Sequence, residues 1–190
     1  MTDEFVHIRI VLGIILGLSL THLIKGSISF IQHPGSKKIY IIHILWVAYV
    51  FITIIHFWWR EFALKNITEW EFFDYLYIIC YFVLYYSICA ILYPEDLKDF
   101  KDYKAYFYSR KNWFFGALSL CYLADFLDIV VKGTDYFYVD SSMHKIRLFS
   151  HLFLCLLAIK LKNPKYHLFM VIGFISFELW FIFKYYFVEI

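Results

Sequence analysis

The sequence predicts an all-α membrane protein, a polytopic transmembrane bundle of about six helices. Of its 190 residues, 62% are hydrophobic and 24% are aromatic. The mean hydropathy is +0.64, and long apolar runs without a polar face fill almost the whole length. Soluble domains are about 45–50% apolar, and about 20 apolar residues in a helix cross the hydrocarbon layer. The lipid bilayer is therefore the expected partner of most of the chain.

The helices are separated by turn signals. The first apolar run ends at His33-Pro34-Gly35, the third ends at Pro94, and Asn163-Pro164 separates the last two. The chain starts with acidic residues and has no small-residue cleavage site, so the first run is expected to be a permanent helix and not a signal peptide. The fifth run is the shortest, and a tilted or partly re-entrant path stays open for it. The expected helices span residues 6–31, 39–62, 70–93, 113–131, 146–161 and 166–187.

The longest loop predicts an amphipathic helix over residues 95–111, lying on the membrane surface. Its apolar residues recur every three to four positions, and Pro94 followed by two acids is a good helix start. One interpretation is a connector between the third and fourth helices. The other is a docking surface for a cytoplasmic regulator, an anionic ligand or anionic lipid headgroups. The basic residues of this candidate contact are Lys98, Lys101, Lys104, Arg110 and Lys111.

The distribution of positive charge predicts the orientation. Eleven Lys and Arg residues fall on the side of the loops after the first, third and fifth helices, and seven fall on the other side. The positive-inside rule places the first group in the cytoplasm and both termini outside. No loop is long enough for a soluble domain, so residues 1–190 are expected to form one transmembrane domain of a multi-pass inner-membrane protein.

Composition and motifs exclude several functions. The net charge of +2 does not indicate nucleic-acid binding. The four cysteines lie in apolar runs without CxxC spacing, so neither a disulfide nor a metal site is expected. His43 and His56 have the 13-residue spacing found in di-haem membrane cytochromes, but no second helix has such a pair, and no cofactor is expected. No catalytic motif is present, so no catalytic residue is assigned and an enzyme is the less favoured class.

Ionisable side chains at membrane depth are costly and mark candidate functional sites. Asp125 and Asp128 share a helix face and repel each other, so they require a cation or water nearby. A structural ion pair and a water-lined path both remain open for them, with Arg9, Arg147 and His22 as candidate partners. The predicted polar path consists of Asp125, Asp128, Glu178, His22 and His151.

Two further segments have alternative interpretations. The segment His56–Phe62 places two tryptophans beside Arg60 and Glu61 at the outer end of the second helix. It is either an aromatic belt with a snorkelling arginine or an external vestibule whose charge is set by Arg60 and Glu61. Gly13 and Gly17 form a small-xxx-small face in the first helix, which packs either inside one protomer or between subunits.

Four segments carry a resemblance: His33–Gly35, His56–Phe62, Tyr93–Leu97 and Arg110–Phe115. They resemble those of a group of small bacterial multi-pass membrane proteins that has no assigned activity. In format, the chain is also loosely similar to stand-alone membrane effectors of bacterial defence systems, some of which assemble into channels. This likeness supplies no functional residues.

The first functional hypothesis is a homo-oligomeric channel or pore-like protein, an effector gated from the cytoplasm. The second is a small proton-coupled carrier or a membrane enzyme, with the histidines and carboxylates as a proton relay. The third is a membrane scaffold that recruits a soluble partner through the basic segment.

Overall fold

The structure, a computed structural model, describes residues 3–35, 38–67, 69–131 and 141–186. These residues form helices and loops, with no strand among them, which confirms the expected all-α helical bundle. The elements are α1 (Asp3–Gln32), α2 (Ile41–Arg60), the 3-10 helix η1 (Glu61–Asn66), α3 (Phe72–Leu92), α4 (Tyr103–Val131), α6 (Ser141–Lys160) and α7 (Pro164–Tyr186).

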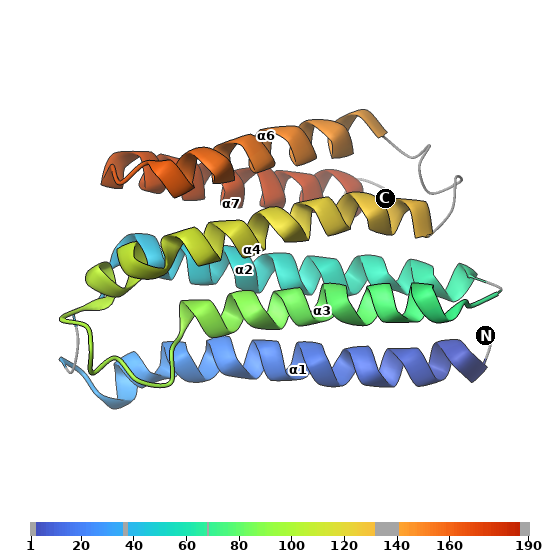
Figure 1. Cartoon of the computed structure of the whole chain (residues 1–190), viewed down its shortest axis with the longest axis horizontal. Helices are drawn as coiled ribbons and strands as arrows, with labels where there is room; N and C mark the ends of the chain where they lie inside the picture. Colours follow the sequence, from blue (N-terminus) through green and yellow to red (C-terminus); the bar gives the residue numbers. More distant parts are fainter. Residues whose placement is uncertain (1–2, 36–37, 68, 132–140, 187–190) are drawn as a thin grey trace.

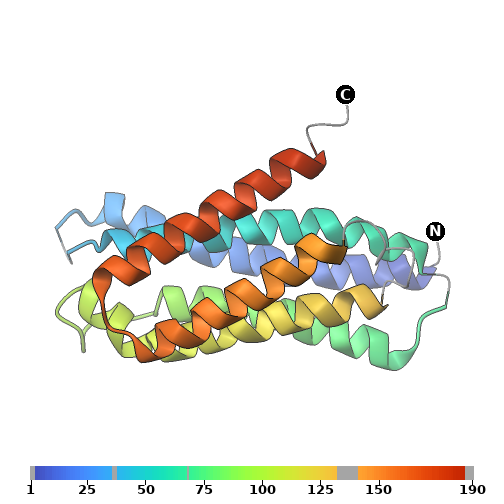
Figure 2. The ribbon, with the colours of Figure 1, turned by 90° about the horizontal axis from the view of Figure 1, so that it is seen from above.

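The long helices lie side by side along one axis (Figure 1). α1 begins and α7 ends at the same end of the bundle, which we call the termini end; η1 lies there too. The links from α1 to α2, α3 to α4 and α6 to α7 lie at the opposite end, the three-loop end. α1 packs on α3, α3 on α4, α4 on α6, and α2 on α7. α7 crosses the other helices obliquely (Figure 2).

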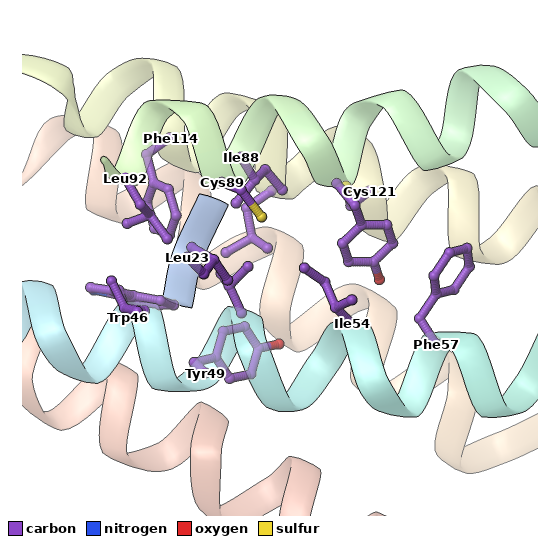
Figure 3. Packing of buried hydrophobic residues seen from close by; sticks show 14 of the residues in the cluster. Leu23, Trp46, Tyr49, Ile54, Phe57, Ile88, Cys89, Leu92, Phe114 and Cys121 are labelled. Carbon is purple, nitrogen blue, oxygen red and sulfur yellow. The ribbon is translucent and has the colours of Figure 1, made fainter. Parts of the chain in front are cut away.

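The interior is filled by large apolar side chains from facing helices. Trp46, Ile54 and Phe57 of α2 point toward Ile88 and Cys89 of α3 (Figure 3), and all five are 0–1% exposed. In lipid there is no hydrophobic drive between helices, so dense van der Waals packing of this kind holds them together. The aromatic residues fill much of that space with rings in edge-to-face contact, such as Trp46 and Phe114 at 5.2 Å between centroids.

Four helices in the described part of the chain are long and apolar enough to cross a membrane: residues 5–32, 41–65, 72–92 and 164–186. The chain is accordingly a membrane protein. α4 and α6 are not among these four spans, but they run beside the other helices for most of their length (Figure 1).

The prediction of a separate surface helix over residues 95–111 is wrong. Residues 95–102 form a loop, and residues 103–111 are the first turns of α4, which continues without a break to Val131. The reason is a stronger helix start further along the chain. The Asp102 carboxylate accepts a hydrogen bond from the Ala105 backbone N–H at 2.8 Å, so it caps the helix there.

One glycine is required by close packing. A Cβ added to Gly26 would lie 2.3 Å from the Tyr93 ring, whose residue is 3% exposed and confined between helices. We expect Gly26→Ala to destabilise the protein by about 1–3 kcal/mol, because the ring must shift within a packed interior. Gly17→Ala on the same helix is the matched control, since no atom lies within 4 Å of its added Cβ. Thermal unfolding in detergent measures both, and equal melting temperatures would contradict the prediction.

Candidate functional site

Four helices bring charged side chains together inside the termini half of the bundle. His56 and Arg60 come from α2, Asp125 from α4, Arg147 from α6 and Glu178 from α7. His56 Nδ1 lies 2.5 Å from Glu178 Oε1, and Arg147 Nη2 lies 3.4 Å from Glu178 Oε2. Arg147 Nη1 lies 4.0 Å from Asp125 Oδ2, and Arg60 forms an ion pair with Asp125. We call these five residues the ion network.

The ion network is almost completely buried within one chain. Glu178 is 0% exposed, Arg147 3%, His56 4% and Arg60 8%. Two guanidinium groups face two carboxylates, so the four charges balance while His56 is neutral. The charges have lost most of their water, with Asp125 the most exposed at 13% of its side chain, and they remain tolerable because they are paired with one another.

Tyrosine hydroxyls surround the network. The Tyr81 hydroxyl donates to Asp125 Oδ1 at 3.3 Å, and the Tyr77 hydroxyl donates to the Ala124 carbonyl one residue earlier. Tyr49 and Tyr122 are hydrogen-bonded to each other through their hydroxyls. The Arg147 guanidinium lies 6.0 Å from the centre of the Tyr122 ring, within reach of a cation–π contact. The Tyr81 hydroxyl and the Tyr122 ring face thus replace part of the lost hydration.

Four of the five residues of the predicted polar path lie in the ion network or one helical turn from it. Asp125 and Glu178 belong to the network, and Asp128 is buried (3% exposed) one turn beyond Asp125. His151 is buried one turn after Arg147, with its ring 4.0 Å from that of Phe174.

His22 lies elsewhere in the bundle. Its Nε2 donates to the Tyr93 carbonyl at 2.7 Å, near the three-loop end. The structure therefore does not bring His22 together with the four other residues of the predicted path.

The structure also differs from the predicted external vestibule at Arg60 and Glu61. Arg60 and Glu61 are 8% and 6% exposed, so neither stands at an open mouth as expected. The physical reason is the ion pair of Arg60 with Asp125, which holds the guanidinium inside the bundle. Asp125 belongs to α4, so the sequence of the second helix alone does not reveal this pair.

The five basic residues predicted as a cytoplasmic contact are also not equivalent. Lys98, Lys101, Lys104 and Arg110 are exposed. Lys98 Nζ lies 2.7 Å from Asp96 and lowers the pKa of that carboxyl below its ordinary value through the hydrogen bond. Lys111 is 3% exposed, so it is not available to a ligand on this surface as predicted.

Lys111 instead binds the end of a helix. Its ammonium donates to the Ala158 carbonyl at 2.9 Å and to the Ile159 carbonyl, in the last turn of α6. The last carbonyls of a helix have no partner within the helix and carry partial negative charge. Lys111 therefore ties α4 to the end of α6.

A cluster of aromatic rings separates the ion network from the three-loop end. The aromatic cluster consists of Trp46 of α2, Phe114 and Phe115 of α4, and Phe174 of α7, all 0–2% exposed. Trp46 lies 5.2 Å from Phe114 and Phe115 and 5.6 Å from Phe174 between ring centroids. α2, α4 and α7 all begin at the three-loop end, and in each of them the residues of the aromatic cluster come before those of the ion network. The aromatic cluster therefore lies on the three-loop side of the network. The polar interior is therefore closed on that side.

Sequence reasoning missed the contact of His56 with Glu178, because it considered His56 through its spacing to His43 and as the first residue of the segment His56–Phe62. Arg147 was one of several possible partners for the aspartates, and it is the one that joins the network. The segment His56–Phe62 was interpreted as an aromatic belt or an external vestibule, whereas its Arg60 is buried and pairs with Asp125. In the described residues no group of three or more His, Cys, Asp or Glu side chains is arranged to hold a metal ion.

Comparison with known proteins gives no match: no family model, no curated protein and no solved structure is similar to this chain. The membrane character rests on the four apolar helices, and any finer function rests on the geometry of the ion network and its surroundings.

Proposed function

We propose that the protein is a small proton-coupled carrier of the inner membrane, and that the ion network is its coupling element. The observation that carries the proposal is a histidine–carboxylate pair, His56 and Glu178, joined to two arginines inside one protomer. Ionisable groups buried in a membrane protein typically belong to ion or proton pathways.

The chemistry of His56 supports protons as the coupling ion. Imidazole is the side chain whose ordinary pKa lies between pH 5 and 8, whereas arginine keeps its charge throughout. A proton added to His56 would change the charge of the network by one unit. Because Glu178 contacts both His56 and Arg147, this change alters the balance that holds α2, α6 and α7 together.

The proposal includes six membrane crossings with the three-loop end in the cytoplasm. The outward face of α6 supports this, because Ile146, Phe149, Phe153 and Leu156 form one exposed apolar stripe. α4 presents Trp113, Leu120 and Leu127 in the same way. The charged residues Asp125, Asp128 and Arg147 of these helices are buried or half-buried. Lys104, Arg110, Lys145 and Lys160 are exposed toward the helix ends, so the middle of each surface suits lipid.

Replacement of His56 by glutamine tests the function. The amide still offers Glu178 a hydrogen bond, but it does not titrate between pH 5 and 8. In proteoliposomes containing a pH-sensitive dye, we expect proton flux to fall by about a hundredfold or more, the lower end of what a positioned proton-transfer group contributes. The matched control is His33→Gln at an exposed position. Wild-type flux of His56→Gln from pH 5 to 8 would contradict the proposal.

A homo-oligomeric channel, gated from the cytoplasm in the manner of a bacterial defence effector, is the second candidate. It is favoured by the outward face of α1, where Gly17 has open space beside it and Thr21 is exposed one turn later. Small residues on a lipid-facing surface let a second copy approach closely. Mass measurement in lipid nanodiscs distinguishes the candidates, because a closed ring supports the channel and a monomer supports the carrier.

A further inference from the structure

A polar cavity of about 500 Å³ lies at the three-loop end, away from the ion network. It is formed between the last turns of α1 and the segment from Tyr93 to Tyr103, and its charged or titratable lining residues include His22, Lys25 and Glu95. The carrier proposal does not use this cavity, and a ligand site here is independent of whether the ion network carries protons.

Two contacts fix the walls of the cavity. The Tyr93 ring packs directly on Gly26, where no Cβ fits, and the Tyr93 carbonyl accepts the His22 Nε2 proton at 2.7 Å. Because a carbonyl only accepts, Nε2 carries the proton, and Nδ1 of the neutral ring is then an acceptor. Ser29 Oγ donates to the Gly26 carbonyl at 2.6 Å and is also hydrogen-bonded to the Tyr103 side chain, so it already has its partners.

The two full charges on the cavity wall are kept apart. Lys25 and Glu95 both line it, yet among the described residues neither has an oppositely charged group within 4.0 Å. A wall with one cation, one carboxylate and one neutral acceptor suits a ligand that carries both charges. An ammonium group donates to Glu95 and to His22 Nδ1, and an anionic group pairs with Lys25.

We propose that this cavity binds a phosphoethanolamine group, with its phosphate on Lys25 and its ammonium on Glu95 and His22. The neighbouring α1 residues Ile24 and Ile28 are exposed apolar side chains, so the acyl chains of a lipid whose headgroup enters the cavity have an apolar surface to lie against. The same group also exists as a free soluble compound, and competition between the lipid and the free compound separates the two sources.

Native mass spectrometry of the delipidated protein provides the test. Phosphatidylethanolamine and phosphatidylcholine with identical acyl chains are titrated separately, because the choline nitrogen has no N–H to donate. We expect phosphatidylethanolamine to bind about tenfold more tightly, and Lys25→Gln to weaken both lipids by about tenfold. Glu95→Gln should weaken phosphatidylethanolamine to the level of phosphatidylcholine. The matched controls Lys65→Gln and Glu69→Gln, exposed near the opposite end, should leave both affinities unchanged.

Every outcome bears on the proposal. Equal affinity for the two lipids, or unchanged binding by Lys25→Gln and Glu95→Gln, overturns it. Stronger binding of phosphatidylglycerol than of phosphatidylethanolamine also overturns it, because an anion alone would then be sufficient. If free O-phosphoethanolamine displaces the lipid at similar concentration, the soluble compound is the ligand. If it does not, and the lipid preference holds, the ligand is the headgroup.

Discussion

Glu178→Leu is expected to destabilise the protein by about 3–5 kcal/mol. The substitution removes the carboxylate that contacts both His56 and Arg147, and Arg147 is 3% exposed with its guanidinium among aromatic rings. A buried charge that loses its partner keeps its full desolvation cost, and measured losses for broken buried pairs fall in this range. Reversible unfolding in mixed micelles measures the change. Glu69→Leu, at an exposed position, should stay within about 0.5 kcal/mol of the wild type.

A second variant separates structure from function. Arg147→Met combined with Glu178→Leu removes both charges and leaves Asp125 paired with Arg60. Replacing a buried ion pair by apolar groups of similar volume is often neutral or stabilising. The double variant should therefore recover most of the stability of the single variant while proton flux stays lost. If the double variant is as unstable as Glu178→Leu, the loss comes from packing around residue 178 and not from the unpaired arginine.

The fold was largely predictable because lipid imposes simple rules. Apolar runs bounded by Pro34, Pro94 and Pro164 placed most helix ends within about three residues of those observed. The exceptions were α4, whose first turns lie in the segment expected to be a separate surface helix, and α6, which begins at Ser141, five residues before the expected start. The apolar spacing continues from Leu97 to Phe107, but only the part after Asp102 is helical, because the Asp102 cap determines where the hydrogen-bonded ladder begins.

The candidate site was predictable only in part, because ion pairs across helices depend on their relative rotation. Asp125 and Glu178 could be recognised from their depth in the membrane. Their partners Arg60 and His56 are 65 and 122 positions away in sequence, and no local pattern relates them. The same limit explains why His22 was grouped with the network although it lies near the three-loop end.

Phe174→Ser is expected to open a leak through the aromatic cluster. Phe174 is 2% exposed, contacts Trp46, and lies one turn before Glu178 on α7. Its ring also lies 4.0 Å from that of His151, beside the hydrogen-bonded pair of Tyr49 and Tyr122. A hydroxyl in the vacated space has these polar groups as neighbours, so water can enter and make several hydrogen bonds. Proton leak in proteoliposomes under a membrane potential should then rise above the wild-type level.

Phe174→Ala makes the same space without the hydroxyl and is the critical comparison. Water in the space left by alanine has one polar partner fewer than in the serine variant, so alanine should cost about 3–5 kcal/mol of stability with a much smaller leak. Phe153→Ser, on the lipid-facing side of α6 and 62% exposed, should leave the leak unchanged. Equal leaks from the serine and alanine variants would indicate general loosening of the bundle. A leak from serine alone means that hydration at residue 174 joins the ion network to the three-loop end.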